Sequence, residues 1–299
     1  MDLIYLRNSE IDRVKWDARI ATSAQQLPYA YSWYLDATAE NWDAIVINDY
    51  DAVFPLPWKK KWGVRYVYPP FFIQQLGLFS AQKHESSLID SILQLAAKHF
   101  KFIELYLNFN DAPSSDAVER RNFELNLNTS DLRQNYSENT RRNIKKAESS
   151  SLQIRKASSA EKIIELFRKG RGAQVKTLDN SDYKRFEKIV QACEQRSAIE
   201  HYEVYTAQGI LCAGACLLKT AGRVVFIFSG NTDEGRKSGA MHCLIDYIIK
   251  AHSGREIIFD FEGSNDENLA RFYQSFGAQN KSYPFVKLNN LSFPYNLFK

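Results

Sequence analysis

The order of elements expected from the sequence occurs twice along the 299-residue chain. Each half predicts a helix, three antiparallel strands, a helix, a strand, a helix and a final strand. The strands are expected from short apolar or alternating runs, and the helices from apolar residues three and four positions apart. Repetition of one order predicts an α/β chain of two similar lobes, each a mixed, mainly antiparallel sheet flanked by helices.

In the first half, the turn residues around Asn48–Asp51 join two apolar strands, and the basic residues Lys59–Lys61 are expected to form the next turn. Residues 86–100 place apolar side chains on one helical face. The remaining expectations are helices that begin near Ser9 and span 114–121, and strands at 3–6, 42–47, 52–57, 64–69, 102–108 and 123–128.

In the second half, Ser264 and Glu267 have the spacing of a capping box, so a helix is expected to begin there and to end before Gly277. The other helices are expected at 160–169, 182–195 and 237–252, and the strands at 201–207, 210–218, 223–230, 256–262 and 283–289.

A polar helix at residues 136–148 lies between the two halves and predicts a lobe boundary near residue 130. The expected lobes are therefore 1–130 and 131–299. The tail LSFPYNLFK is expected to return to the first lobe, because it follows the last strand of the second.

Composition excludes several classes of protein. With 44% hydrophobic and 25% charged residues the chain can bury a large core. No apolar run approaches the roughly 18 residues that cross a bilayer, and the N-terminus lacks a signal-peptide pattern. Four cysteines without CxxC spacing favour a reducing compartment, and five scattered histidines do not favour a metal site. These features predict a soluble, metal-free cytoplasmic protein.

The net charge is only +4, but it is unevenly distributed. Residues 130–190 contain 15 Lys and Arg against 8 Asp and Glu. A basic middle segment favours an anionic ligand nearby, although a solvated basic helix explains the same pattern.

Several blocks resemble the FemAB-type branch of the GNAT acyltransferase superfamily. The most specific is FDFEGSNDENLARFYQSFGA at 259–278. YSENTRRNIKKAE at 136–148 resembles the arginine-rich helix between the lobes of that branch, and blocks at 29–37, 55–77 and 228–249 resemble small bacterial members. The resemblance implies a GNAT-type fold and transfer of an acyl or aminoacyl group to an amine. The chain has no room for the coiled-coil arm of larger peptidoglycan-bridge enzymes, which weakens a transfer-RNA assignment.

GNAT enzymes hold the donor's pyrophosphate with an R/Q-x-x-G-x-G/A loop at a helix start. Here Arg236 and Gly239 fit that pattern, and Met241 replaces its last small residue. The resemblance therefore implies acyl-CoA as donor substrate and a donor site in the second lobe. The residues expected there are Ser229, Arg236, Lys237, Gly239 and Ala240. A purely structural glycine at a helix start is the alternative interpretation.

Asp260 and Glu262 lie at the carboxyl end of an expected strand, where desolvation raises a carboxylate pKa toward the range of a general base. Tyr273 is a candidate acid for the leaving group. The alternatives are that Asp260 caps a loop, that Glu262 approaches the next helix, and that Tyr273 packs in the core.

Four basic residues are candidates for binding the acceptor: Lys61, Arg65, Arg141 and Arg171. The sequence thus predicts an N-acyltransferase that moves an acyl group from an acyl-CoA-type thioester to an amine on a small molecule or cell-wall precursor. Two alternatives stay open: aminoacyl transfer from charged transfer RNA, and a non-catalytic module that binds an anionic metabolite.

Overall fold

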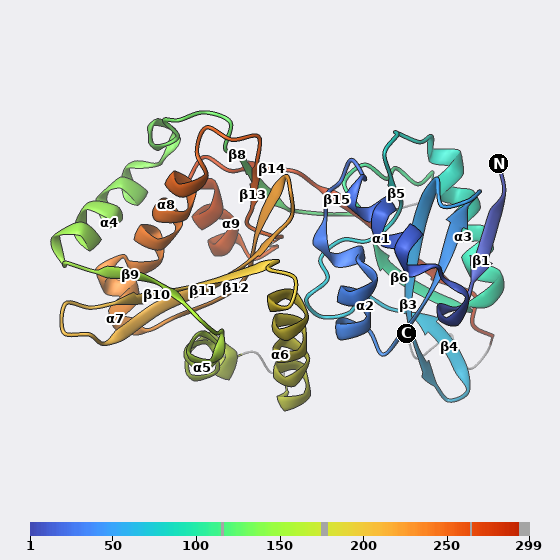
Figure 1. Cartoon of the computed structure of the whole chain (residues 1–299), viewed down its shortest axis with the longest axis horizontal. Coiled ribbons are helices and arrows are strands. Elements are labelled where there is room, and N and C mark those ends of the chain that lie inside the picture. The colour runs from blue at the N-terminus through green and yellow to red at the C-terminus, as the bar shows by residue number, and fades with distance from the viewer. Residues whose placement is uncertain (115–116, 175–178, 264, 293–299) are drawn as a thin grey trace. The chain divides into compact units, whose positions relative to one another are not determined.

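The computed structural model describes residues 1–114, 117–174, 179–263 and 265–292 (Figure 1). Contacts between Cα atoms divide the chain into two compact units. Unit 1 is Met1–Arg121 with Ser282–Lys299, and unit 2 is Asn122–Lys281. The chain therefore passes between the units after Arg121 and again after Lys281, whereas the sequence predicts one boundary near residue 130.

Unit 1 is a mixed sheet with helices. Its helices are α1 (Arg13–Ala21), α2 (Ser32–Thr38) and α3 (Ser86–His99), with short 3-10 turns at Asn8–Glu10 and Pro28–Ala30. Its strands are β1 (Leu3–Leu6), β2 (Asn41–Ile47), β3 (Ala52–Lys61), β4 (Val64–Val67), β5 (Phe79–Ser80), β6 (Phe102–Tyr106), β7 (Val118–Arg120) and β15 (Tyr283–Asn289).

Unit 2 has the same kind of architecture. Its helices are α4 (Glu138–Ser149), α5 (Glu161–Lys169), α6 (Asn180–Glu194), α7 (Asp233–Ser238), α8 (Ala240–His252) and α9 (Glu267–Gln274), with 3-10 turns at Arg133–Asn135 and Arg171–Gln174. Its strands are β8 (Phe123–Asn126), β9 (Gln153–Ala157), β10 (Ile199–Tyr205), β11 (Leu211–Lys219), β12 (Arg223–Asn231), β13 (Ile258–Asp260) and β14 (Gln279–Asn280).

Among the described residues, the two sheets have matching strand orders. Unit 1 has β1-β2-β3-β4-β6-β15-β7, with β5 on β3, and unit 2 has β9-β10-β11-β12-β13-β8-β14. In each order the fourth and fifth strands are parallel, and the other neighbours are antiparallel. The predicted class, two α/β lobes with mixed, mainly antiparallel sheets, is confirmed by this arrangement.

The sixth strand of each sheet comes from a distant part of the sequence. β15 pairs with β6 in unit 1, and β8 pairs with β13 in unit 2. In Figure 1 the orange-red β15 accordingly lies among the blue and cyan strands, and the green β8 lies beside β13. The expectation that each half closes its own sheet is wrong here, because an alternating pattern specifies a strand and its buried face but not its partner.

Helix starts follow their capping residues. Asp12, Ser137, Asp179 and Asp266 each accept hydrogen bonds from backbone N–H groups of the following turn, which otherwise lack partners. The first helix thus begins after Asp12 rather than near residue 9, and α9 begins after Asp266. The expected cap at Ser264 lies outside the described residues.

Three other expectations differ from the structure. Residues 118–120 form β7 rather than part of a helix, and residues 115–116 are outside the described set. Lys59–Lys61 belong to β3, and the turn is Trp62–Gly63. The expected helix at 237–252 is divided at Gly239 into α7 and α8. The tail from residue 293 lies outside the described residues, so its return to the first lobe stays a prediction.

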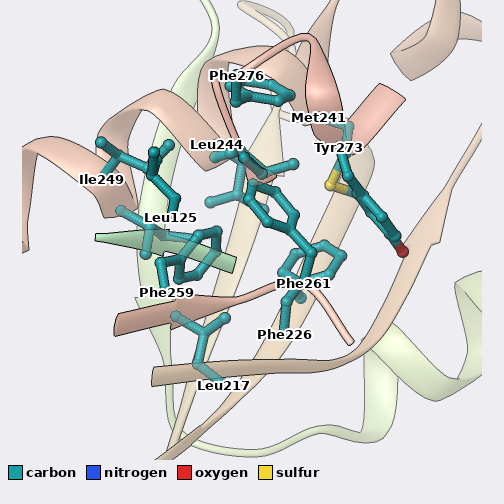
Figure 2. Packing of buried hydrophobic residues seen from close by; sticks show 14 of the residues in the cluster. Leu125, Leu217, Phe226, Met241, Leu244, Ile249, Phe259, Phe261, Tyr273 and Phe276 are labelled. Carbon is teal, nitrogen blue, oxygen red and sulfur yellow. The ribbon is translucent and has the colours of Figure 1, made fainter. Parts of the chain in front are cut away.

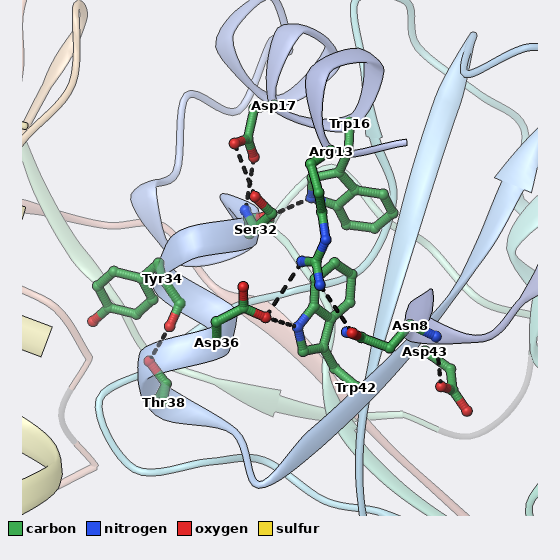
Figure 3. A network of polar contacts seen from close by, with 11 residues as sticks. Asn8, Arg13, Trp16, Asp17, Ser32, Tyr34, Asp36, Thr38, Trp42 and Asp43 are labelled. Carbon is green, nitrogen blue, oxygen red and sulfur yellow. Dashed lines mark hydrogen bonds and ion pairs between the residues drawn. The ribbon is translucent and has the colours of Figure 1, made fainter. Parts of the chain in front are cut away.

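Two buried tryptophans organise one side of unit 1 (Figure 3). Trp16 and Trp42 are at most 1% exposed, and their rings lie 5.1 Å apart. Trp16 donates its Nε1–H to the carbonyl of Ala30, and Trp42 donates to Asp36, which also pairs with Arg13. Each indole therefore buries a large apolar surface without leaving its polar atom unsatisfied.

An apolar cluster fills the space between the sheet of unit 2 and the helices α8 and α9 (Figure 2). Phe259 and Phe261, the sequence neighbours of Asp260, are both fully buried in this cluster. Each such ring contributes roughly 1.5–3 kcal/mol relative to an exposed position. This cluster fixes the first turn of α8 and the face of α9 that carries Tyr273.

In the described part of the chain no helix is long and apolar enough to cross a bilayer. Within the same residues no group of three His, Cys, Asp or Glu side chains is arranged to hold a metal ion.

Candidate active site

Strands β12 and β13 pair over only three residues, from Arg223 opposite Ile258 to Val225 opposite Asp260. β13 ends at Asp260, whereas β12 continues to Asn231. The pairing of β12 with β11 shifts register at Ile227, which is a β-bulge that increases local twist. The far half of β12 therefore has no parallel neighbour. The helix α5 packs against β12, and residues of α7, α8 and α9 line a pocket together with it.

A pocket of about 320 Å³ lies along this half of β12. Its apolar walls are contributed by β12, α8 and α9, and its polar groups come from β12, α7, α8 and α9. The lining residues are Phe226, Ser229, Asn231, Gly235, Arg236, Met241, His242, Leu269, Phe272 and Tyr273. The donor-site candidates Ser229 and Arg236 and the catalytic candidate Tyr273 thus line one pocket.

Tyr273 is 6% exposed and belongs to both the apolar cluster and the pocket. In Figure 2 its hydroxyl oxygen lies at the edge of the cluster, away from the other labelled rings. Burial raises the pKa of Tyr273 well above its usual value, and the negative charges of Glu262 and Asp260 add to that shift. The phenol therefore keeps its proton at neutral pH and can act as a donor.

Two other polar groups of this pocket were not identified from the sequence. Burial lowers the pKa of His242 to about 4, so its imidazole is neutral at pH 7. Its ring stands edge-on to Phe272 at 5.0 Å. The buried Oδ1 atom of Asn231 accepts no hydrogen bond from the described residues. The sequence offers a single signal for each residue: Asn231 lies shortly before the Arg236–Met241 motif, and His242 follows it directly.

A second pocket, of about 480 Å³, adjoins the first through Arg236. Besides Arg236 it is lined by Lys169, Gly170, Arg171 and Asp233. Three cations against one carboxylate give this pocket a positive character. Arg236 pairs with Asp233, Arg171 lies 3.8 Å from Asp266, and these exposed pairs are weak enough to be exchanged for an anionic ligand.

Asp260 is fully buried, and both of its oxygens have partners. Oδ2 accepts from Nη1 of Arg223 at 2.6 Å, and Oδ1 accepts from the backbone N–H of Glu262 at 2.9 Å. Arg223 also donates to Glu124 at 2.7 Å. The bond from the N–H of Glu262 is the kind of loop cap that the alternative interpretation of Asp260 supposed, and the contact with Arg223 is a structural ion pair. A catalytic role of Asp260 stays a prediction.

Glu262 has a φ of 61°, in the left-handed region that non-glycine residues seldom occupy. The hydrogen bond from its N–H to Asp260 holds this conformation. Glu262 is half-buried and close enough to Tyr273 for its charge to act on the phenol. The structure thus joins Asp260, Glu262 and Tyr273 in one electrostatic group, although Asp260 and Glu262 do not line the pocket itself.

Gly239 and Ala240 have a structural explanation. Gly239 has a φ of 77°, and a Cβ at this position would lie 2.5 Å from the carbonyl oxygen of Asn143 in α4. Ala240 is fully buried, whereas Lys237 is exposed. Because α4 packs against this helix start, a Gly239→Asp substitution would test folding rather than donor binding.

The predicted acceptor residues are dispersed. Arg65 already pairs with the buried Asp43 at 2.5 Å and stacks on Trp58 at 4.3 Å, so its guanidinium is held in unit 1. Lys61 is exposed at the end of β3, and Arg141 is exposed on α4. Of the four candidates, Arg171 alone lies beside the predicted donor residues in the positive pocket.

The family model described as acetyltransferase (GNAT) domain matches residues 134–273. That range contains both pockets and every residue that lines them. Residues 134–273 are therefore similar to a GNAT domain. The acyltransferase class predicted from the sequence is supported by this match, which contains 15 of the 20 residues of the FDFEGS block but not its last five.

Solved structures share the fold of the whole chain. FemX is 14% identical, with a TM-score of 0.69 over 100% of this chain and 99% of FemX. The C-terminal domain of a protein named as a lysylphosphatidylglycerol synthetase from Agrobacterium fabrum is 10% identical, with a TM-score of 0.60 over 96% and 95%. L-PGS from Bacillus licheniformis is 11% identical, with a TM-score of 0.55 over 96% and 94%. No curated protein sequence matches the chain. The FemAB-type GNAT resemblance is confirmed at the level of the fold.

Proposed function

We propose that this protein is an N-acyltransferase whose donor, a thioester of CoA or another phosphopantetheine carrier, binds in unit 2. The observation that carries the proposal is the pair of adjoining pockets that share Arg236, one positive and one mainly apolar. A CoA thioester has the same division, with phosphates at one end and an uncharged arm and acyl group at the other.

The positive pocket suits the phosphates. Arg171 and Arg236 offer planar guanidinium groups that bind phosphate oxygens in pairs, and Lys169 adds a third charge. In the apolar pocket, Oδ1 of Asn231 is an acceptor for an amide N–H of the pantetheine arm. In this proposal side chains, rather than backbone N–H groups, bind the phosphates, because α4 packs against the backbone at Gly239, where the helix begins.

The chemical step joins the amine nitrogen to the thioester carbonyl carbon and breaks the carbon–sulfur bond. Glu262 takes a proton from the attacking amine, directly or through water, and Tyr273 gives its proton to the departing sulfur. The raised pKa of Tyr273 keeps the phenol protonated at neutral pH. Asp260 holds the backbone of Glu262 and is a positioning residue. The acceptor is an amine on a small molecule or cell-wall precursor, as the FemAB resemblance implies.

Calorimetry with CoA, acetyl-CoA and pantetheine tests the donor site. The double variant Arg171→Gln with Arg236→Gln should bind CoA at least about tenfold more weakly and leave pantetheine affinity unchanged. The matched control is Arg141→Gln with Arg142→Gln, which removes the same charge from α4. Equal CoA affinity in the wild type and the folded Arg171/Arg236 variant would contradict the proposal.

Aminoacyl transfer from charged transfer RNA is a second candidate, favoured by α4. Its inner face packs through Thr140, Ile144 and Ala147, and its outer face exposes four basic side chains: Arg141, Arg142, Lys145 and Lys146. This candidate predicts RNA binding that weakens steeply with salt and that the Arg141/Arg142 control variant loses. Binding of CoA without thiol release in the presence of any amine would instead favour a non-catalytic module.

A further inference from the structure

The hairpin of β3 and β4 extends beyond its neighbours in the sheet of unit 1. Lys60 pairs with Arg65 and Lys61 with Val64, whereas β6 begins only opposite Tyr66. The residues from Lys60 to Arg65 therefore have sheet partners only within the hairpin. Figure 1 shows β4 and the adjoining end of β3 at the border of unit 1.

The turn of this hairpin consists of Trp62 and Gly63, with φ angles of 50° and 80°. Two positive φ angles define a type I′ turn, for which Asn–Gly is the favoured pair. A bulky residue at the first position is strained. Trp62 is also 64% exposed, so it recovers little stability by burial. Burial alone does not account for tryptophan at this position.

The charged residues that lie close to Trp62 in the sequence are all positive. Residues 58–67 contain Lys59, Lys60, Lys61 and Arg65 and no acidic residue. Lys60 and Lys61 are exposed, and Nζ of Lys61 lies 4.6 Å from the centre of the Trp62 ring. Lys59 is directed to Glu40 at 3.0 Å instead. The tip therefore presents one indole between flexible ammonium groups.

We propose that this hairpin tip docks on the surface of an anionic phospholipid bilayer. Tryptophan is enriched at the headgroup level of membranes. Its ring lies there at the boundary with the acyl chains, and its N–H stays hydrated. Lysine side chains reach from such a ring to lipid phosphates. A convex two-residue turn enters a headgroup layer, whereas nucleic-acid binding uses grooves with several stacking rings. The docking is independent of the proposed transferase reaction.

Vesicles test the proposal with the full chain. Sedimentation with phosphatidylglycerol-containing vesicles should retain the protein, and pure phosphatidylcholine vesicles should not. Trp62→Asn should weaken this binding at least about fivefold and keep or raise the melting temperature, since Asn suits the turn. Lys60→Glu with Lys61→Glu should weaken it at least about tenfold. A blue shift of tryptophan emission on binding should disappear in Trp62→Asn.

The matched control is Arg142→Glu with Lys146→Glu on α4, which makes the same charge change and should retain binding. If this control lost as much vesicle binding as the Lys60/Lys61 variant, the binding would come from general charge attraction, and the proposal would be overturned. Unchanged vesicle binding in Trp62→Asn would overturn it as well. So would a Trp62 signal that responds to single-stranded RNA and not to anionic vesicles.

Discussion

Nη1 of Arg223 lies 2.6 Å from Oδ2 of Asp260, and the two side chains are at most 2% exposed. The same nitrogen lies 2.7 Å from Oε1 of Glu124. The three residues belong to β12, β13 and β8, so one guanidinium joins three adjacent strands. It thereby fixes β8, the strand that comes from the end of the first half of the sequence, in the sheet of unit 2.

Asp260→Asn should destabilise the protein by about 2–4 kcal/mol, because it leaves a buried guanidinium with one carboxylate instead of two. Urea unfolding measures the change. Glu262→Gln is the control and should alter stability by no more than about 1 kcal/mol. Equal losses in the two variants would show that Arg223 does not depend on Asp260.

Glu262→Gln should lower kcat at least about tenfold with donor affinity nearly unchanged, because it removes the proton acceptor but keeps the side-chain shape. Thiol release from acetyl-CoA in the presence of an amine measures kcat. Full activity from pH 6 to 9 in this variant would assign the proton to another group, and His242→Asn is then the next variant to measure.

Tyr273→Phe should lower kcat by about 10–100-fold, because the variant keeps the ring in the apolar cluster but cannot protonate the leaving sulfur. Donor affinity and melting temperature should stay close to those of the wild type. The control substitution Tyr247→Phe, at an exposed position on α8, should leave turnover unchanged. A fully active Tyr273→Phe protein would restrict Tyr273 to packing.

Gly239→Ala should destabilise unit 2 by about 2–4 kcal/mol. The substitution places a methyl group against the Asn143 carbonyl and requires a left-handed conformation of a non-glycine residue. Thermal and urea unfolding measure the loss. Gly209→Ala is a control with a φ of 78° and no atom within 4 Å of the new methyl, so it should cost only about 1 kcal/mol. Similar losses in both variants would exclude the contact with α4 as the cause.

Asp111 makes stability depend on pH. Burial raises the pKa of Asp111 from 3.8 to about 8, although the backbone N–H groups of Leu78 and Asn108 partly oppose the shift. Between these values the folded state keeps a proton that the unfolded state has lost. The contribution of Asp111 to the free energy of unfolding therefore falls as pH rises from about 4 to 8. The slope is up to about 1.4 kcal/mol per pH unit.

Asp111→Asn should remove that contribution, so the variant gains relative stability as pH rises through this window. Urea unfolding at pH 5, 6, 7 and 8 measures the difference, and the exposed Asp131→Asn is the control. A difference between wild type and Asp111→Asn that stays constant with pH would contradict the raised pKa.

The sequence predicted the site in part. Ser229, Arg236 and Tyr273 were assigned to one lobe from a motif and a resemblance, and they do line one pocket. His242 and Asn231 were missed, because a single polar residue near a helix start has no distinctive pattern. Gly239 was interpreted as a phosphate cradle, since the sequence does not indicate that Asn143, nearly a hundred residues away, packs against it.

The sequence by itself determined the local elements: the apolar runs at residues 42–47 and 52–57 specify β2 and β3, and Ser137 starts α4. These depend on interactions between residues close in the chain, which composition and spacing record. Only the tertiary structure decided that β8 and β15 join the sheets of the opposite halves, and that Arg223 meets Glu124 and Asp260. Both strands present an equally apolar face, so the choice of partner depends on the total burial and charge pairing across the whole fold.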